Sequence, residues 1–172
     1  MKVTGYVACI CEGAAEHAIM DRLLEEDLLK FDVETLIEGE ILRCRNGQQF
    51  EQRYLRKEFA MDLTIVRILD SKKENFKLSK DYLHKVKVID VVTAPEIEML
   101  IIISEGKYKD FQKSKKAPSI FCKSDLKCKN VKSYQFVQAY FSDINKLMHS
   151  IKEYKRISKP VKGKYMLYDL LK

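Results

Sequence analysis

Three acidic residues lie where the sequence changes from an apolar run to a turn or a helix. Glu12 follows the apolar run 3–11, Glu16 comes four residues later, and Asp70 ends a second apolar run that begins at Asp62. Hard divalent cations such as Mg²⁺ bind carboxylate oxygens and usually keep several water ligands. If the fold brings them together, Glu12, Glu16 and Asp70 can hold Mg²⁺ or Mn²⁺ and orient a phosphate for attack by water.

The same acids also have a purely structural explanation. Acidic side chains are common at strand ends, and Glu16 in a first helical turn complements the positive end of the helix dipole. Glu98 has two interpretations as well, since it lies in the first turn of an otherwise apolar helix. It either faces solvent or points back toward Glu12 as a further acid of the site. Spacing alone leaves these alternatives open.

The run 3–11 is apolar at almost every position, which predicts a strand buried on both faces, and β-rich runs over 62–70 and 86–92 predict two further strands. After Gly13, which allows a sharp turn, helical periodicity predicts a helix over 14–30. The remaining predicted elements are short strands over 33–37 and 41–44, a turn at Asn46-Gly47, helices over 50–59, 79–85, 133–141 and 142–156, an irregular lysine-rich stretch over 107–132, and a final segment, 165–171, that docks back on the body.

Residues 93–96 have the pattern of a capping box. Thr93 is the expected N-cap, Glu96 follows three residues later, and Pro95 stands in the first turn. The helix that follows, over 97–106, is apolar on nearly all sides and should lie in the core.

Strands that alternate with helices up to residue 106 predict an α/β fold with a mostly parallel central sheet flanked by helices. Functional groups of such sheets gather at the carboxyl ends of the strands, so we expect Glu12 and Asp70 to meet there. The predicted organisation is an α/β domain over residues 1–106 and a basic, mainly helical C-terminal extension over 107–172 that packs on it.

The positive charge of the chain is confined to its C-terminal part. Residues 1–103 contain 15 Lys and Arg against 19 Asp and Glu, whereas residues 104–172 contain 17 against 6, and the net charge is +7. This segregation of charge, with aromatic residues among the lysines, favours a surface that binds nucleic acid over a lysine-rich surface that is merely solvated. Lys outnumbers Arg by 16 to 1 after residue 103, which indicates contact with the phosphate backbone. The residues expected to contact nucleic acid are Lys72, Lys73, Lys113, Lys115, Lys116, Lys123, Lys127, Lys155 and Arg156.

Several classes of protein do not fit this sequence. The longest unbroken apolar run, 99–103, is far too short to span a membrane, and the N-terminus has no convincing signal peptide. The five cysteines are odd in number and lack Cys-x-x-Cys spacing, which predicts reduced, mostly buried thiols in a cytoplasmic protein. Neither Gly-x-Gly-x-x-Gly nor a P-loop is present.

Segment 10–16 (Ile-Cys-Glu-Gly-Ala-Ala-Glu) resembles the first motif of Toprim domains, in which a strand ends in Glu-Gly and a helix follows. It is similar in particular to small Toprim-like proteins of bacterial anti-phage systems, the RloB-like and OLD-nuclease relatives. Their strand ending in Asp-x-Asp is matched by 69–72 (Leu-Asp-Ser-Lys), and their Pro-acid segment before an apolar helix by 94–100 (Ala-Pro-Glu-Ile-Glu-Met-Leu). Lys72 stands where the second Asp is expected, so it could contact phosphate while Glu74 or Glu98 supplies the missing ligand.

The resemblance implies a Toprim-type nuclease that uses Mg²⁺ or Mn²⁺ to hydrolyse phosphodiester bonds of nucleic acid in phage defence. In that case Glu12 and Asp70 are catalytic, and the metal ligands come from Glu12, Glu16, Asp70 and Glu98. The alternative is a catalytically inactive Toprim-like binding or partner subunit that works with a separate ATPase. Neither reading fixes the oligomeric state, and a homo-oligomer is compatible with both.

Overall fold

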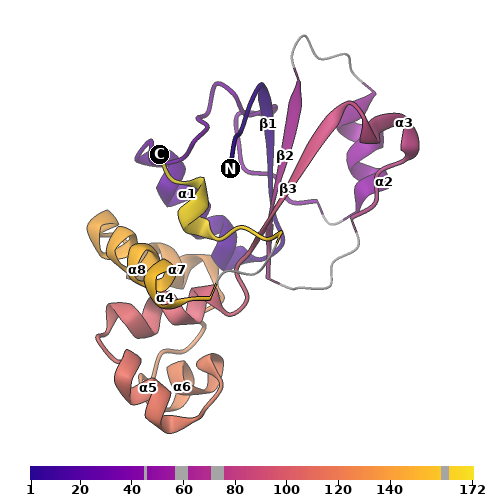
Figure 1. The fold of residues 1–172 in the computed structure, drawn as a ribbon. Coiled ribbons are helices and arrows are strands. Elements are labelled where there is room, and N and C mark those ends of the chain that lie inside the picture. Colours follow the sequence, from indigo (N-terminus) through magenta and orange to yellow (C-terminus); the bar gives the residue numbers. More distant parts are fainter. Residues whose placement is uncertain (45, 57–61, 71–75, 160–162) are drawn as a thin grey trace.

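Three parallel strands form the central sheet of this α/β protein. The computed structural model describes residues 1–44, 46–56, 62–70, 76–159 and 163–172. The strands β1 (Tyr6–Cys11), β2 (Leu63–Leu69) and β3 (Val86–Val92) pair in the order β1-β2-β3, with helices on both sides (Figure 1). All three coincide with the predicted apolar runs, so the α/β class and the parallel sheet are confirmed.

Strands β1 and β2 are buried along nearly their whole length because they are mostly apolar, whereas β3 is only partly buried. Val7, Cys9 and Cys11 of β1 belong to one core cluster, whereas Ala8 and Ile10 belong to a second cluster on the opposite face. In Figure 1, α1 (Ala14–Glu25), α4 (Glu96–Ser104), α7 (Tyr134–Tyr140) and α8 (Ile144–Ile157) cover one side, and α2 (Gly47–Phe50) and α3 (Lys80–Leu83) cover the other.

Several predicted boundaries are corrected by the structure. The first helix ends at Glu25 rather than at residue 30, and segments 33–37 and 41–44 make only isolated bridges to β1, through Leu36 and Leu42. Asn46 is a helix N-cap rather than a turn residue, since its side-chain oxygen accepts a hydrogen bond of 2.8 Å from Gln48 N–H. Of the helix predicted over 50–59, the described part is the end of α2 and a π-helical turn, η1 (Glu51–Leu55).

The prediction that 107–132 is irregular is wrong. This stretch contains α5 (Tyr108–Ser114) and α6 (Pro118–Ser124), which pack against each other at the end of the molecule farthest from α2 and α3 (Figure 1). Phe111 and Phe121 form an edge-on ring contact at 5.5 Å between the two helices. The many lysines hide this apolar periodicity in the sequence, because they occupy the exposed faces of both helices.

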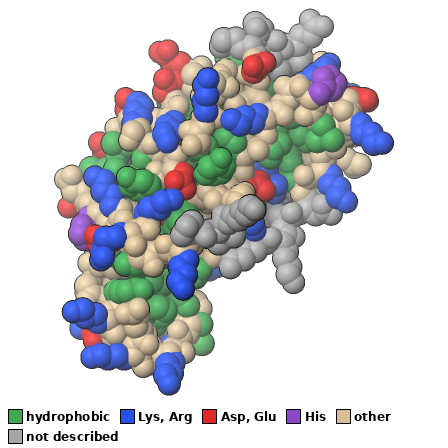
Figure 2. Space-filling view, in the orientation of Figure 1, with side chains coloured by type: hydrophobic (Ala, Val, Ile, Leu, Met, Phe, Trp, Pro, Cys, Tyr) green, Lys and Arg blue, Asp and Glu red, His purple; other side chains and the backbone are tan. Residues whose placement is uncertain are grey.

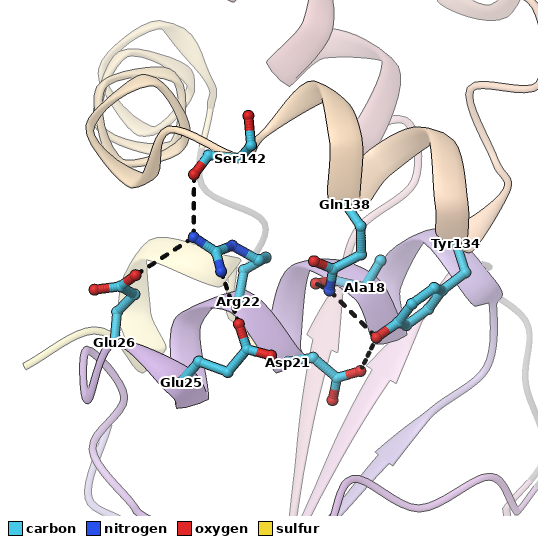
Figure 3. Close-up of polar contacts among 8 residues, drawn as sticks. All are labelled: Ala18, Asp21, Arg22, Glu25, Glu26, Tyr134, Gln138 and Ser142. Atoms are coloured by element: carbon cyan, nitrogen blue, oxygen red, sulfur yellow. Dashed lines mark hydrogen bonds and ion pairs between the residues drawn. The ribbon is translucent and has the colours of Figure 1, made fainter.

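Helix α7 is clamped to α1 by polar contacts that surround an apolar interface (Figure 3). The Tyr134 hydroxyl donates a hydrogen bond of 2.8 Å to Asp21, and the Gln138 amide donates one of 3.0 Å to Ala18 O. Arg22 donates to Ser142 O at 3.1 Å, just after α7. Helix α8 packs mainly on α4. The helices after residue 106 therefore share the main hydrophobic core with α1 and α4.

The C-terminal segment docks back on the body, as the sequence predicts. Val92 N–H donates to Tyr165 O at 3.0 Å beside the end of β3, and Lys30 N–H donates to Leu170 O at 2.9 Å. A 3₁₀ turn, η2 (Leu167–Leu170), lies between these contacts. Among the described residues, no helix is both long enough and apolar enough to cross a membrane. All five cysteines are free, and Cys9, Cys11 and Cys122 are buried.

Candidate acidic site

Glu12 and Asp70 lie together at the carboxyl edge of the sheet. Parallel pairing of β1 and β2 aligns Cys11 with Ile68, so the residues that follow each strand come out at the same edge. One carboxylate oxygen of Glu12 accepts a hydrogen bond of 2.9 Å from the backbone N–H of Asp70. The first acid is therefore held against the strand that carries the second.

Glu16 reaches the same edge from the first turn of α1, and only 3% of its surface is exposed. Its carboxylate folds back over Gly13, where a Cβ would lie 2.0 Å from Glu16 Oε2, so a glycine makes this close approach possible. Burial raises the pKa of Glu16 above its usual range, and the charge of Asp70 adds to this rise. Hydrogen bonds from its own backbone N–H and from the Thr93 hydroxyl, with the nearby Lys132, oppose the rise without cancelling it.

Thr93 joins the ends of β2, β3 and α1 rather than capping a helix. Its buried hydroxyl lies 3.0 Å from Leu69 O and 3.3 Å from a Glu16 carboxylate oxygen. The predicted capping box is therefore wrong: Pro95 is the N-cap of α4, and the Glu96 carboxylate is buried instead of reaching back to Thr93. The sequence pattern is misleading here because the Thr93 hydroxyl contacts Leu69 O and the packing of the fold buries the Glu96 carboxylate.

Glu98, in the first turn of α4, points inward. It is 4% exposed, and its carboxylate oxygen Oε1 lies 3.8 Å from the ammonium of Lys132. Of the two interpretations that the sequence leaves open, the solvent-facing one is thereby excluded. We call Glu12, Glu16, Asp70 and Glu98 the acid edge.

Lys132 contacts the acid edge, and the sequence did not predict this. Its ammonium lies 3.0 and 3.2 Å from the two carboxylate oxygens of Asp70, 62 residues earlier in the chain. Partial burial alone would lower the pKa of Lys132, but the hydrogen bond to Asp70 and the charges of Glu98, Asp70 and Glu16 outweigh it and raise that pKa. Lys132 is therefore a cation among the acids at neutral pH. In the sequence it is one lysine of many, distinguished only by its place before Ser133, the N-cap of α7.

The donor chemistry of the acid edge suits a hard cation, because all four side chains offer carboxylate oxygens. In the described arrangement, however, the Lys132 ammonium supplies the positive charge beside Asp70 and Glu98. No three His, Cys, Asp or Glu side chains of the described part of the chain are placed so that they could hold a metal ion. Among the described residues the acid edge is therefore not a preformed metal site, and Lys132 is the cation that contacts it.

A cavity of about 370 Å³ adjoins the acid edge, and Lys132 belongs to both. Its lining comes from α6 and from the segment that leads to α7: Ser119, Lys123, Cys128, Lys129, Asn130, Val131 and Lys132. We call it the lysine cavity. Of the described residues expected to contact nucleic acid, Lys123 alone lines it.

The other residues expected to contact nucleic acid are spread over the surface. Lys116, Lys155 and Arg156 are engaged in ion pairs within the chain, with Asp125, Asp169 and Glu153. Lys113, Lys115, Lys123 and Lys127 make no ion pair with any described residue, and Lys72 and Lys73 lie outside the described residues, as does Glu74. Lys and Arg side chains predominate among the charged ones over α5 and α6, at the lower end of the molecule in Figure 2.

The chain matches no protein-family model, no curated protein and no solved structure. The Toprim resemblance therefore rests on segments 10–16, 69–72 and 94–100 of the sequence itself. Two of its three motif acids, Glu12 and Asp70, are in contact through the Asp70 backbone. The acid that follows Pro95 in the third segment, Glu96, is buried and its carboxylate has no hydrogen-bond partner among the described residues, whereas Glu98 of the same segment contacts Lys132.

Proposed function

We propose that this protein is a metal-dependent, Toprim-type nuclease that hydrolyses phosphodiester bonds of nucleic acid, acting in phage defence. One observation carries the proposal: four carboxylates from β1, α1, β2 and α4 converge on one sheet edge, directly beside a cavity lined with lysines. Phosphodiester hydrolysis needs both halves of this arrangement, since acids must activate water while cations hold the phosphate.

Each residue of the acid edge has a defined part in this proposal. The carboxylates of Glu12, Glu16, Asp70 and Glu98 would hold Mg²⁺ or Mn²⁺, which supplies an activated water and offsets charge on the phosphate. Glu12 is oriented by the Asp70 N–H, and Glu16 by the Thr93 hydroxyl. Lys132, released from Asp70, donates to a phosphate oxygen.

Glu98 would replace the carboxylate that the Toprim pattern has at the position of Lys72. The resemblance leads us to expect a second Asp there, and the chain has a lysine. Glu98 supplies a carboxylate to the same edge from a different element, and its burial beside Lys132 holds it in place. The number of available acids is thus retained although one motif position has changed.

The test is a cleavage assay on single- and double-stranded DNA and RNA with Mg²⁺ or Mn²⁺. Glu12→Gln keeps an acceptor oxygen for the Asp70 N–H but removes the charge, so we expect cleavage to fall by about 100-fold or more. Asp110→Asn, on the exposed α5 ion pair with Lys107, is the matched control and should leave cleavage unchanged. If the unaltered protein cleaves none of these substrates with either metal, the proposal is refuted.

The second candidate is a catalytically inactive, nucleic-acid-binding partner of a separate ATPase. The observation that favours it is the position of Lys132, which neutralises the acids without any metal. This candidate predicts that the full chain binds an oligonucleotide equally well in EDTA and in Mg²⁺. Binding that disappears in EDTA excludes it, and binding that persists without any cleavage supports it over the nuclease.

A further inference from the structure

The lysine cavity has the chemistry of an anion site. Three of its lining residues are lysines, Lys123, Lys129 and Lys132. Ser119 and Asn130 also line it, and their hydroxyl and amide groups can donate hydrogen bonds. No carboxylate stands among the lining residues that the structure describes. Asp125, which lies between Lys123 and Lys129 in the sequence, is paired with Lys116, and Lys132 is paired with Asp70 and Glu98. Lys123 and Lys129 make no ion pair with any described residue, so an anion bound beside them would offset the repulsion between their charges.

The cavity walls are fixed by backbone contacts rather than formed by loose side chains. Leu126 N–H donates to Phe121 O at 3.2 Å, and Cys128 N–H donates to Cys122 O at 2.9 Å, so the segment after α6 folds back on that helix. Cys122 in turn contacts Glu98 O at 3.6 Å, which ties α6 to α4 and hence to the acid edge. A site built on such anchored segments is pre-organised for a ligand.

The volume and the position of the cavity define its ligand further. About 370 Å³ is within the range of pockets that bind small molecules, and it exceeds what a single simple ion needs. Because Lys132 lines the cavity and also contacts Asp70 at 3.0 Å, a group bound there lies beside the acids.

We propose that the lysine cavity binds one phosphate group of a nucleotide or of a nucleic-acid chain, with Lys123 and Lys129 as its permanent contacts and Lys132 shared with Asp70. Phosphate and Asp70 then compete for the same ammonium, so the occupied cavity loosens the ion pair of the acid edge. The inference deepens the proposed function and rests on it only for the hydrolysis that follows; the binding itself needs neither metal nor cleavage.

The test titrates the full chain in EDTA with inorganic phosphate, with the dinucleotide TpT and with its 5′-phosphorylated form, pTpT, followed by calorimetry and by NMR shifts. Lys123→Gln and Lys129→Gln should each weaken binding about tenfold, because each removes one charge-assisted hydrogen bond. Lys109→Gln on α5 and Lys152→Gln on α8 are charge-matched controls outside the cavity and should change binding less than about twofold.

The competition at Lys132 has a test of opposite sign. Asp70→Asn frees the ammonium and should tighten phosphate binding about threefold, whereas Asp110→Asn removes the same charge from α5 and should not. Tighter binding of pTpT than of TpT identifies a terminal phosphate as the ligand, and equal binding identifies a bridging diester. Equal weakening by cavity and control variants, or no saturable binding of any of the three probes, overturns the inference.

Failure of this inference and failure of the proposed function are distinguishable. Phosphate binding that depends on Lys123 and Lys129, without cleavage in Mg²⁺ or Mn²⁺, removes the nuclease and leaves the phosphate site. Cleavage that is insensitive to Lys123→Gln and Lys129→Gln removes the phosphate site and leaves the nuclease. Circular dichroism of each variant verifies that the fold is intact.

Discussion

Two acids of α4 stand two residues apart and are almost equally buried, yet their surroundings differ. Glu98 is 4% exposed and faces the acid edge, where the Lys132 ammonium lies 3.8 Å away. Glu96 is 1% exposed, and neither of its carboxylate oxygens has a hydrogen-bond partner among the described residues. Burial raises the pKa of Glu96 to about 8, and the backbone of Leu167 and the ammonium of Lys155 oppose this only in part.

The difference shows what separates a candidate site from a buried polar residue. At the acid edge, a backbone N–H, a threonine hydroxyl and an ammonium contact the carboxylates and stabilise their charge. Around Glu96 the Leu167 backbone and the Lys155 charge act in this direction, but they do not offset the effect of burial, and the carboxyl group is mostly protonated at pH 7. Burial alone therefore does not mark function in this fold.

The largest effect is expected from Glu96→Gln. Because the pKa of Glu96 is about 8 in the folded chain, its stabilising protonated state is fully present below about pH 4.5 and is lost as the pH rises through 8. A glutamine stays neutral, so the variant should gain about 2–4 kcal/mol over the unaltered protein at pH 9 and little at pH 4. Urea unfolding at both pH values measures this, and an equal difference at the two values would contradict it.

Lys132→Met makes the acid edge resemble the surroundings of Glu96, since it leaves Asp70 and Glu98 without their cation. We expect a loss of about 1–2 kcal/mol at pH 7, less than for a fully buried pair because Lys132 is 55% exposed. The loss should be reversed by Mn²⁺. A stability deficit that Mn²⁺ does not change would indicate lost packing instead.

Thr93→Val sharpens the account of how the acid edge keeps its charge. The buried hydroxyl lies near Glu16 and Leu69 O, and its removal should cost about 1 kcal/mol of unfolding free energy and raise the pKa of Glu16 further. Carbon-13 NMR titration of the Glu16 carboxyl measures the shift. Thr93→Ser retains the hydroxyl and is the control, so an equal rise in both variants would contradict the role of the hydrogen bond.

The smallest effect is expected at a surface pair. Arg156 and Glu153 are in contact at 2.8 Å on α8, and both are solvent-exposed to a degree that lets water and salt screen them. Arg156→Gln should leave the melting temperature unchanged within error. A clear loss of stability would show that ion pairs away from the acid edge also hold this fold together.

The sequence predicts the parts of the acid edge that depend on strand ends. Glu12 and Asp70 follow mostly apolar runs, and such runs form parallel strands whose carboxyl ends meet. Lys132 and the inward direction of Glu98 depend on how α4 and the segment before α7 pack, which no local pattern encodes. Thr93 shows the limit most clearly, because its capping pattern is sound locally and a tertiary hydrogen bond overrides it.

The sequence predicts some helices of the C-terminal part but not others. The periodicity of 142–156 predicts α8, and the apolar residues of 165–171 predict docking on the body. Helices α5 and α6 were missed because each is only seven residues long and rich in lysine, so too few apolar positions repeat for the period to stand out.

The central claim is that the acid edge binds a divalent cation in exchange for Lys132, and electron paramagnetic resonance of Mn²⁺ bound to the full chain tests it directly. We expect one Mn²⁺ per chain, bound about tenfold more tightly by Lys132→Met, which removes the competing cation, and about tenfold more weakly by Asp70→Asn. The absence of Mn²⁺ binding in both the unaltered chain and Lys132→Met, or affinity that neither substitution changes, would contradict the account.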